Sequence, residues 1–222
     1  MFCNPLYRGQ SAASEPEVAA VQNLIMGVIP DQRGPNLADA APADTKGILI
    51  TLHSYSELVL WPWGFTTDPA PNQAGLQAIG DKMVTYNGYL SCQPSVCLYS
   101  ASGTTDDWAY GELGIPAFTF ELGRTFLPAY STVRGEQWDD NGPALQYAAK
   151  IAAAPYQLVY GPDVLSVTQS VEGLSVMITA TIDDRENGGE GIAQAAVTLD
   201  PPGTADLRLI PLTAVDGNFD EP

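Results

Sequence analysis

Residues 48–52 restrict the fold of this chain most, because five successive apolar or β-branched residues are typical of a strand that is covered on both faces. The run ends at His53, the single histidine among 222 residues. Strands of this kind belong to α/β folds, which carry their chemistry at strand ends. His53 therefore has two interpretations, a core histidine satisfied by one hydrogen bond or a metal ligand or base.

The charge balance excludes one large class of partners. The chain has 9 Lys and Arg against 26 Asp and Glu, a net charge of -17. Because no basic patch can form, we expect no nucleic-acid partner. No apolar run approaches the roughly 20 residues of a membrane span, and the N-terminus lacks the regions of a signal peptide. We therefore expect no membrane span.

Helical and strand-like patterns alternate over the first 155 residues. The spacing of apolar residues predicts helices over 14–26, 73–89 and 140–154. Thr104 or Thr105 can cap a further short helix over 104–114. Aromatic and β-branched content predicts a second buried strand over 115–122. Ser14 and Glu17 have the spacing of a capping box at the start of the first helix. Residues 61–72 and 91–103 are rich in turn-forming residues and are expected to be surface loops.

The pattern changes after Pro155. Apolar and polar residues alternate over 163–170, 174–183, 192–199 and 207–212, which predicts antiparallel strands of an incomplete β-sandwich. We therefore expect two domains, residues 1–155 and 156–222. Clustered carboxylates in the second domain have two interpretations, a solvated acidic turn or a calcium site. These carboxylates belong to Asp183, Asp184, Glu186 and Glu190.

Three cysteines are an odd number. Cys92 and Cys97 are close enough in sequence to form a disulfide, which leaves Cys3 over. A secreted protein that lacks the partner of Cys3 would have this pattern, and so would a protein with three free thiols.

Glu121 is the second candidate for chemistry, because a carboxylate at the end of an apolar strand faces solvent, a partner or a site. A serine triad is less favoured: Ser54 adjoins His53, but the chain has no G-x-S-x-G elbow. A catalytic zinc site needs three protein ligands, and this chain supplies one imidazole.

Five sequence blocks resemble the zinc carboxypeptidases of the carboxypeptidase A type, in the same order. They are YRG at 7–9 with SEPE at 14–17, HSY at 53–55 followed by LVLWPWG, LYSASG at 98–103, DWAY at 107–110 and FTFEL at 118–122. The resemblance covers residues 7–155. The remainder is similar to β-sandwich modules that follow bacterial members of the family.

The resemblance implies roles for individual residues. His53 would be a zinc ligand, and Glu121 the general base that takes a proton from water and gives it to the leaving amine. The backbone of Ser54 would help to place the substrate, and Tyr55 would border a subsite. Tyr99 matches a mobile tyrosine that closes over the terminal carboxylate of the substrate.

Two further residues would shape a side-chain pocket. Asp106 matches the position at the floor of that pocket, where a carboxylate goes with a preference for Lys or Arg. The alternative is that Asp106 only supplies negative charge at a helix N-terminus. Thr119 is one strand alternation before Glu121, so it should face the same side and line the pocket.

The family's H-x-x-E zinc ligands, its oxyanion arginine and its Asn-Arg pair are absent from the sequence. We therefore expect the C-terminal part of an extracellular, bacterial zinc carboxypeptidase, truncated at both ends. Its fold would be a three-layer α/β/α domain with a mixed sheet, followed by a partial β-sandwich. The complete enzyme would act with zinc on peptides with a free C-terminus, and this fragment would be inactive. The alternative is a non-catalytic carboxypeptidase-like binding or surface module.

Overall fold

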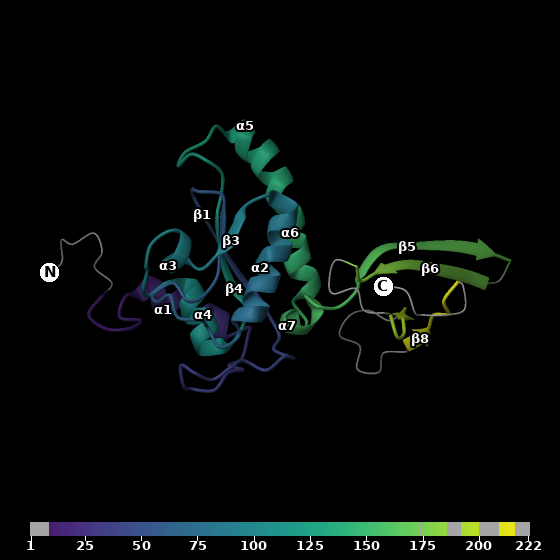
Figure 1. The fold of residues 1–222 in the computed structure, drawn as a ribbon, viewed down its shortest axis with the longest axis horizontal. Helices are drawn as coiled ribbons and strands as arrows, with labels where there is room; N and C mark the ends of the chain where they lie inside the picture. The colour runs from purple at the N-terminus through teal and green to yellow at the C-terminus, as the bar shows by residue number, and fades with distance from the viewer. Residues whose placement is uncertain (1–8, 174, 186–191, 200–208, 216–222) are drawn as a thin grey trace. The chain divides into compact units, whose positions relative to one another are not determined.

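A computed structural model of the chain describes residues 9–173, 175–185, 192–199 and 209–215. The chain divides into two compact units, residues 1–159 and 160–222. Figure 1 traces both units along the chain. None of the helices that the described residues form has the length and apolar character that a membrane crossing requires.

The first unit is built on a four-stranded mixed sheet with the strand order β1-β4-β2-β3. Its strands are β1 (Leu49–His53), β2 (Leu58–Leu60), β3 (Leu90–Cys92) and β4 (Ala117–Glu121). β1 and β4 are parallel, as are β2 and β3, while β2 and β4 are antiparallel. The mixed sheet expected from the sequence is confirmed.

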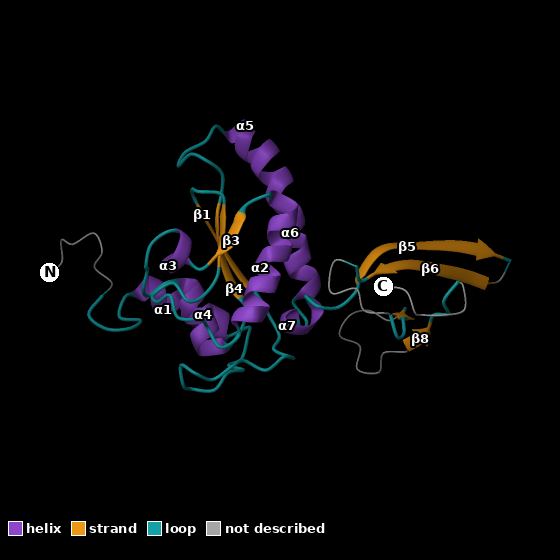
Figure 2. Cartoon of the chain, viewed as in Figure 1, coloured by secondary structure: helices purple, strands orange, loops and turns teal. Residues whose placement is uncertain are grey.

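Helices cover both faces of this sheet, as Figure 2 shows. Helices α2 (Gln73–Asn87) and α6 (Trp138–Ile151) contribute to the larger core, in which Ile79 and Met83 pack in one cluster with Phe118 and Phe120 of β4. Helix α4 (Thr105–Leu113) packs against the other face, and α1 (Pro16–Met26) contributes Ile25 to that smaller core. The unit therefore has the expected α/β/α layers.

Short elements connect these layers. They are α3 (Pro94–Cys97), α5 (Tyr130–Thr132), the π-helix η1 (Val133–Gln137) and α7 (Pro155–Leu158). A disulfide joins Cys92 at the end of β3 to Cys97 at the end of α3. β3 includes residues 91 and 92 of the predicted surface loop, so that prediction is wrong at the start of the loop, and no element was predicted over the residues of β2.

The start of α1 also differs from expectation. Its N-cap residue is Glu15, and no side-chain hydrogen bond caps it within the described chain. The Ser14 hydroxyl instead accepts a hydrogen bond from the Gln10 amide at 3.0 Å and donates to the Glu15 carboxylate. The predicted capping box is therefore wrong. The apolar side chains of α1 stay largely exposed, Leu24 by 70%.

Two further expectations about burial are wrong. The tryptophans of the predicted surface loop, Trp61 and Trp63, are each only 4% exposed. Trp63 packs against the Tyr110 ring of α4 at a centroid distance of 4.9 Å, so aromatic packing draws this loop inward. Conversely, β1 has a single neighbouring strand in the part of the sheet that the structure describes, and its Leu52 is 54% exposed.

The second unit contains two separate two-stranded antiparallel sheets among its described residues. β5 (Asp163–Glu172) pairs with β6 (Ser175–Asp183), and β7 (Ala196–Thr198) pairs with β8 (Leu209–Pro211). Of the candidate calcium ligands, Asp183 forms an ion pair with Arg185. Glu186 and Glu190 lie outside the described residues, so the calcium hypothesis stays a prediction.

Candidate active site

The parallel pairing of β1 with β4 places His53 directly opposite Glu121. Both residues end their strands, so the imidazole and the carboxylate lie at the same carboxyl edge of the sheet. The ladder continues one step further, because the Leu122 amide donates to the His53 carbonyl at 2.9 Å. His53 is exposed and Glu121 half-buried. Both groups can therefore reach a ligand at this edge.

A pair of threonines lies on the same face of the two strands. Thr51 is opposite Thr119 in the register, and their hydroxyl oxygens are 2.8 Å apart. Since strand side chains alternate, Thr51 shares its face with His53, and Thr119 shares its face with Glu121. Thr51 was not among the sequence candidates, although its position two residues before His53 is a signal that could have identified it.

Ser54 and Tyr55 continue the chain after His53. The Ser54 hydroxyl donates to the Phe126 carbonyl at 3.2 Å, which brings the loop after β4 beside the end of β1. Tyr55 is 48% exposed. The Ser54 hydrogen bond places Phe126, in the loop after β4, next to the candidate site.

Tyr99 lies in the segment between α3 and α4, and its side chain is 65% exposed. This segment is fixed on the buried tryptophan loop, since the Ala101 amide donates to the Gly64 carbonyl at 2.9 Å and the Ser100 hydroxyl to the Phe65 carbonyl at 3.1 Å. No hydrogen bond joins Tyr99 to His53 or Glu121 in the part of the chain that the structure describes.

Asp106 lies in the first turn of α4, and its side chain is 2% exposed. Its Oδ1 atom has no hydrogen-bond partner among the described residues. An unpaired carboxylate oxygen is costly to bury, and a cationic group beside it would offset that cost. α4 packs against β4, the strand that carries Thr119 and Glu121.

The neighbouring Asp107 has a structural task. Its Oδ1 atom accepts a hydrogen bond from the Gly64 amide at 2.8 Å, which fastens α4 to the tryptophan loop. Burial raises the pKa of Asp107 from 3.8 to about 6, while the Gly64 hydrogen bond opposes that rise and the charge of Asp106 adds to it. The Thr104 hydroxyl caps the helix by accepting from the Asp107 amide at 3.4 Å.

Arg33 supports the same region without any sequence signal that could have identified it. The side chain is 7% exposed and donates to the carbonyls of Gly111 and Leu37, at 2.7 Å each. Its guanidinium lies 5.8 Å from the Trp63 ring centroid and 5.3 Å from that of Tyr110. These cation–π contacts fix the tryptophan loop on α4.

The residues present fit a catalytic zinc ion only in part. Neutral imidazole is a common zinc ligand, and the exposed His53 can serve as one. Within the described residues, however, no group of three or more His, Cys, Asp or Glu side chains could hold a metal.

The family model described as zinc carboxypeptidase matches residues 2–140. Carboxypeptidase A1 of Rattus norvegicus is 33% identical over 134 residues, which cover 58% of this chain and 28% of that protein. A zinc carboxypeptidase of Saccharothrix mutabilis subsp. capreolus is 42% identical over 79 residues, covering 33% of this chain and 18% of that protein.

The fold is similar to that of solved carboxypeptidase structures. The crystal structure of carboxypeptidase A from Helicoverpa armigera superposes with a TM-score of 0.51 at 23% identity, covering 67% of this chain and 36% of that chain. The matches span a minor part of each relative's length, 28% of rat carboxypeptidase A1. The match to the family model nevertheless covers more than half of this chain, which therefore belongs to the zinc carboxypeptidase family.

Proposed function

We propose that this chain forms the general-base side of a zinc carboxypeptidase site that releases C-terminal residues from peptides. The observation that carries the proposal is the in-register pair of His53 and Glu121 at the carboxyl edge of the sheet. A histidine and a glutamate at neighbouring strand ends can serve as a metal ligand and a base that share one substrate.

Each group would have its own task. His53 would be one zinc ligand, and zinc, when bound, would polarise the substrate carbonyl and acidify water. Glu121 would accept a proton from the attacking water and then deliver it to the leaving amine. The half-buried position of Glu121 supports this role, because a base must be accessible and still be held in place.

The remaining candidates would bind the substrate. The unpaired, buried oxygen of Asp106 supports a pocket for a basic C-terminal side chain, with Thr119 as part of its lining. The exposure of Tyr99 would leave it free to close over the terminal carboxylate. The Ser54 backbone would help to place the peptide, and Tyr55 would border a subsite.

We further propose that the 222 residues alone do not hydrolyse peptides, because His53 is the single imidazole in the sequence and two ligands are still required. An extracellular location is part of the same proposal. It is supported by the disulfide between Cys92 and Cys97, since disulfides persist in oxidising compartments.

The test supplies the missing ligands. The upstream part of rat carboxypeptidase A1 is fused in frame to this chain, and zinc content and residue release from peptides are measured. We expect the fusion to bind zinc and to be active, and Glu121→Gln to retain zinc and lose activity, because the base is not a ligand. Loss of zinc in Glu121→Gln would show that its role is wrong.

A second arm tests the pocket. In the active fusion, Asp106→Leu should lower kcat/KM for peptides that end in Arg by on the order of a hundredfold and improve those that end in Phe, because a buried charge pair is lost. An unchanged preference would return Asp106 to the role of helix N-terminal charge.

A non-catalytic binding module is the second candidate function. The absence of a three-ligand cluster among the described residues favours it. A folded fusion that binds zinc and releases no residue would support this function over the enzymatic one.

A further inference from the structure

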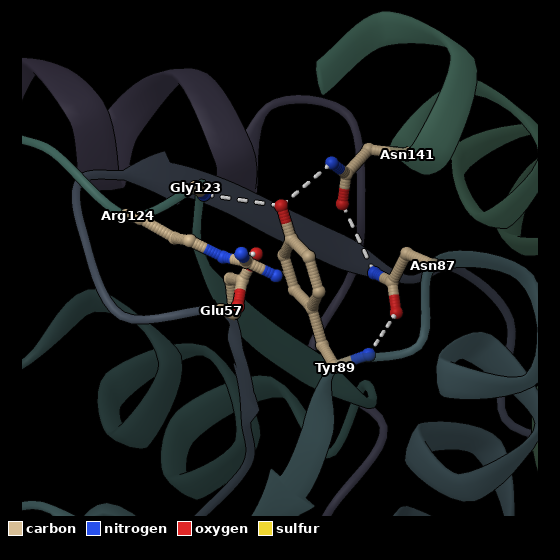
Figure 3. A network of polar contacts seen from close by, with 6 residues as sticks. All are labelled: Glu57, Asn87, Tyr89, Gly123, Arg124 and Asn141. Carbon is tan, nitrogen blue, oxygen red and sulfur yellow. Dashed lines mark hydrogen bonds and ion pairs between the residues drawn. The ribbon is translucent and has the colours of Figure 1, made fainter. Parts of the chain in front are cut away.

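Tyr89 stands directly before β3, and its hydroxyl reaches the point where β4 leaves the sheet. The Tyr89 oxygen accepts a hydrogen bond from the Gly123 amide at 3.1 Å and another from Nδ2 of Asn141 at 3.0 Å (Figure 3). Tyr89 is 8% exposed and Asn141 4%. Water therefore competes little for these hydrogen bonds.

Further hydrogen bonds hold the Tyr89 backbone and the Asn141 side chain in place. The Tyr89 amide donates to Oδ1 of Asn87 at 3.0 Å, and Nδ2 of Asn87 donates to Oδ1 of Asn141 at 3.0 Å. Asn141 also donates to the Gln137 carbonyl at 2.9 Å. Residues from the C-terminus of α2, the start of β3 and the first turn of α6 therefore hold the Tyr89 oxygen in the position where it accepts the hydrogen bond from the Gly123 amide (Figure 3).

Gly123 has a backbone conformation that favours glycine. Its φ angle is +67°, and a Cβ atom at this position would lie 2.1 Å from Nε2 of Gln137. The positive φ angle favours glycine, and the end of the Gln137 side chain occupies the space that a Cβ atom would take. The Gly123 amide thus points to the Tyr89 hydroxyl, while the end of the Gln137 side chain lies beside its Cα atom.

Glu121 lies two residues before Gly123. It is the last residue of β4 and is paired with His53 on one side and Leu58 on the other. Beyond it, the chain is restrained by the Leu122 hydrogen bond to His53, by the Gly123 hydrogen bond to Tyr89, and by an ion pair of Arg124 with Glu57 at 2.8 Å. Arg124 is 83% exposed, and exposed ion pairs restrain a chain only weakly.

We propose that Tyr89 is a positioning residue for Glu121, acting through the Gly123 amide. The inference rests on the proposed role of Glu121 as general base and adds the group that sets its geometry. Proton transfer requires the base to be held within a fraction of an ångström. The buried Tyr89 hydroxyl provides such a restraint just after the strand end, where sheet pairing ceases.

The contrasting explanation is that Tyr89 is only a core residue, since its ring belongs to the larger apolar cluster. Tyr89→Phe separates the two, because it keeps the ring and removes the acceptor. Tyr156→Phe is the matched control. Tyr156 is 6% exposed and its hydroxyl donates to the Gly114 carbonyl at 3.1 Å, on the N-terminal side of β4.

The first measurement uses the 222-residue chain. We expect Tyr89→Phe to accelerate hydrogen exchange at the Gly123 amide about tenfold and to shift the side-chain carboxyl signal of Glu121 in NMR spectra. The signals of His53, the single histidine, should shift with it. Tyr156→Phe should leave all three unchanged. Unchanged Gly123 exchange and Glu121 signal in Tyr89→Phe, or equal changes in both variants, would overturn the proposal.

The second measurement uses the active fusion. Tyr89→Phe should lower kcat about tenfold and leave KM within about twofold, because substrate binding does not depend on the orientation of the base. An unchanged kcat would overturn the positioning role. If the unmutated fusion is inactive, the proposed function fails by itself, and the Glu121 signal in the 222-residue chain still decides the role of Tyr89.

Discussion

The buried carboxyl group of Asp107 predicts how the stability of the first unit depends on pH. Burial raises its pKa from 3.8 to about 6 in the folded chain. A group that binds its proton more tightly when folded stabilises the fold fully below its unfolded pKa. That contribution is lost as pH rises from about 4 to about 6. Asp107→Asn removes the buried charge and keeps an oxygen that can accept the hydrogen bond from the Gly64 amide.

The size of the effect follows from the same pKa. A rise from 3.8 to about 6 corresponds to at most about 3 kcal/mol in the free energy of unfolding. Residual contact with solvent reduces this figure, so we expect about 1–3 kcal/mol. The free energy of unfolding of Asp107→Asn minus that of the wild type should therefore be larger at pH 8 than at pH 4 by that amount.

Denaturant unfolding followed by tryptophan fluorescence measures this difference. The 4 tryptophans, at positions 61, 63, 108 and 138, all lie in the first unit, so the signal reports on that unit. Removing any carboxylate also reduces repulsion in a chain of net charge -17, so the exposed Asp139→Asn serves as control. If the difference between Asp107→Asn and wild type is the same at pH 4 and pH 8, the reasoning is refuted.

Three further predictions use the same unfolding measurement. Ile79→Ala removes a fully buried side chain of α2 and should lower the free energy of unfolding by about 3–4 kcal/mol; a loss below about 1 kcal/mol would contradict its core position. Thr104→Ala removes the cap of α4 and should cost about 0.5–1 kcal/mol, at the low end because that hydrogen bond is 3.4 Å long. Replacing Cys92 and Cys97 together with Ser should cost about 2 kcal/mol, since the disulfide closes a short loop, and equal stability with and without reductant would contradict this.

The longer elements of the fold could be predicted from the sequence. Apolar spacing located α2, a cap at Thr104 or Thr105 located α4, and the aromatic and β-branched run located β4. β2 and β3 were missed because each has only 3 residues. Such strands are too short for periodicity, and pairing with neighbours rather than local preference creates them.

Burial was harder to predict than secondary structure, because it depends on what packs from elsewhere in the chain. Trp61 and Trp63 follow a strand and are interleaved with Pro62 and Gly64, which indicates a surface loop. The loop is buried because Arg33, Asp107 and Tyr110 surround it. No local pattern links the loop to these residues, since Arg33 lies well before it in the sequence and Asp107 and Tyr110 lie in α4 after it.

The candidate site shows the same limit in its geometry. The sequence indicated that His53 and Glu121 each end a strand, yet only the order of the sheet makes β4 the neighbour of β1. Whether the two side chains lie on the same face of the sheet also depends on the register, because a slip by one residue would turn Glu121 to the opposite face. The threonine pair below and the Leu122 amide above support that register. The Tyr89 hydroxyl acts beyond the ladder, at the first residue where register no longer restrains the chain. Loss of that hydroxyl should therefore change the orientation of Glu121 without changing which strands pair.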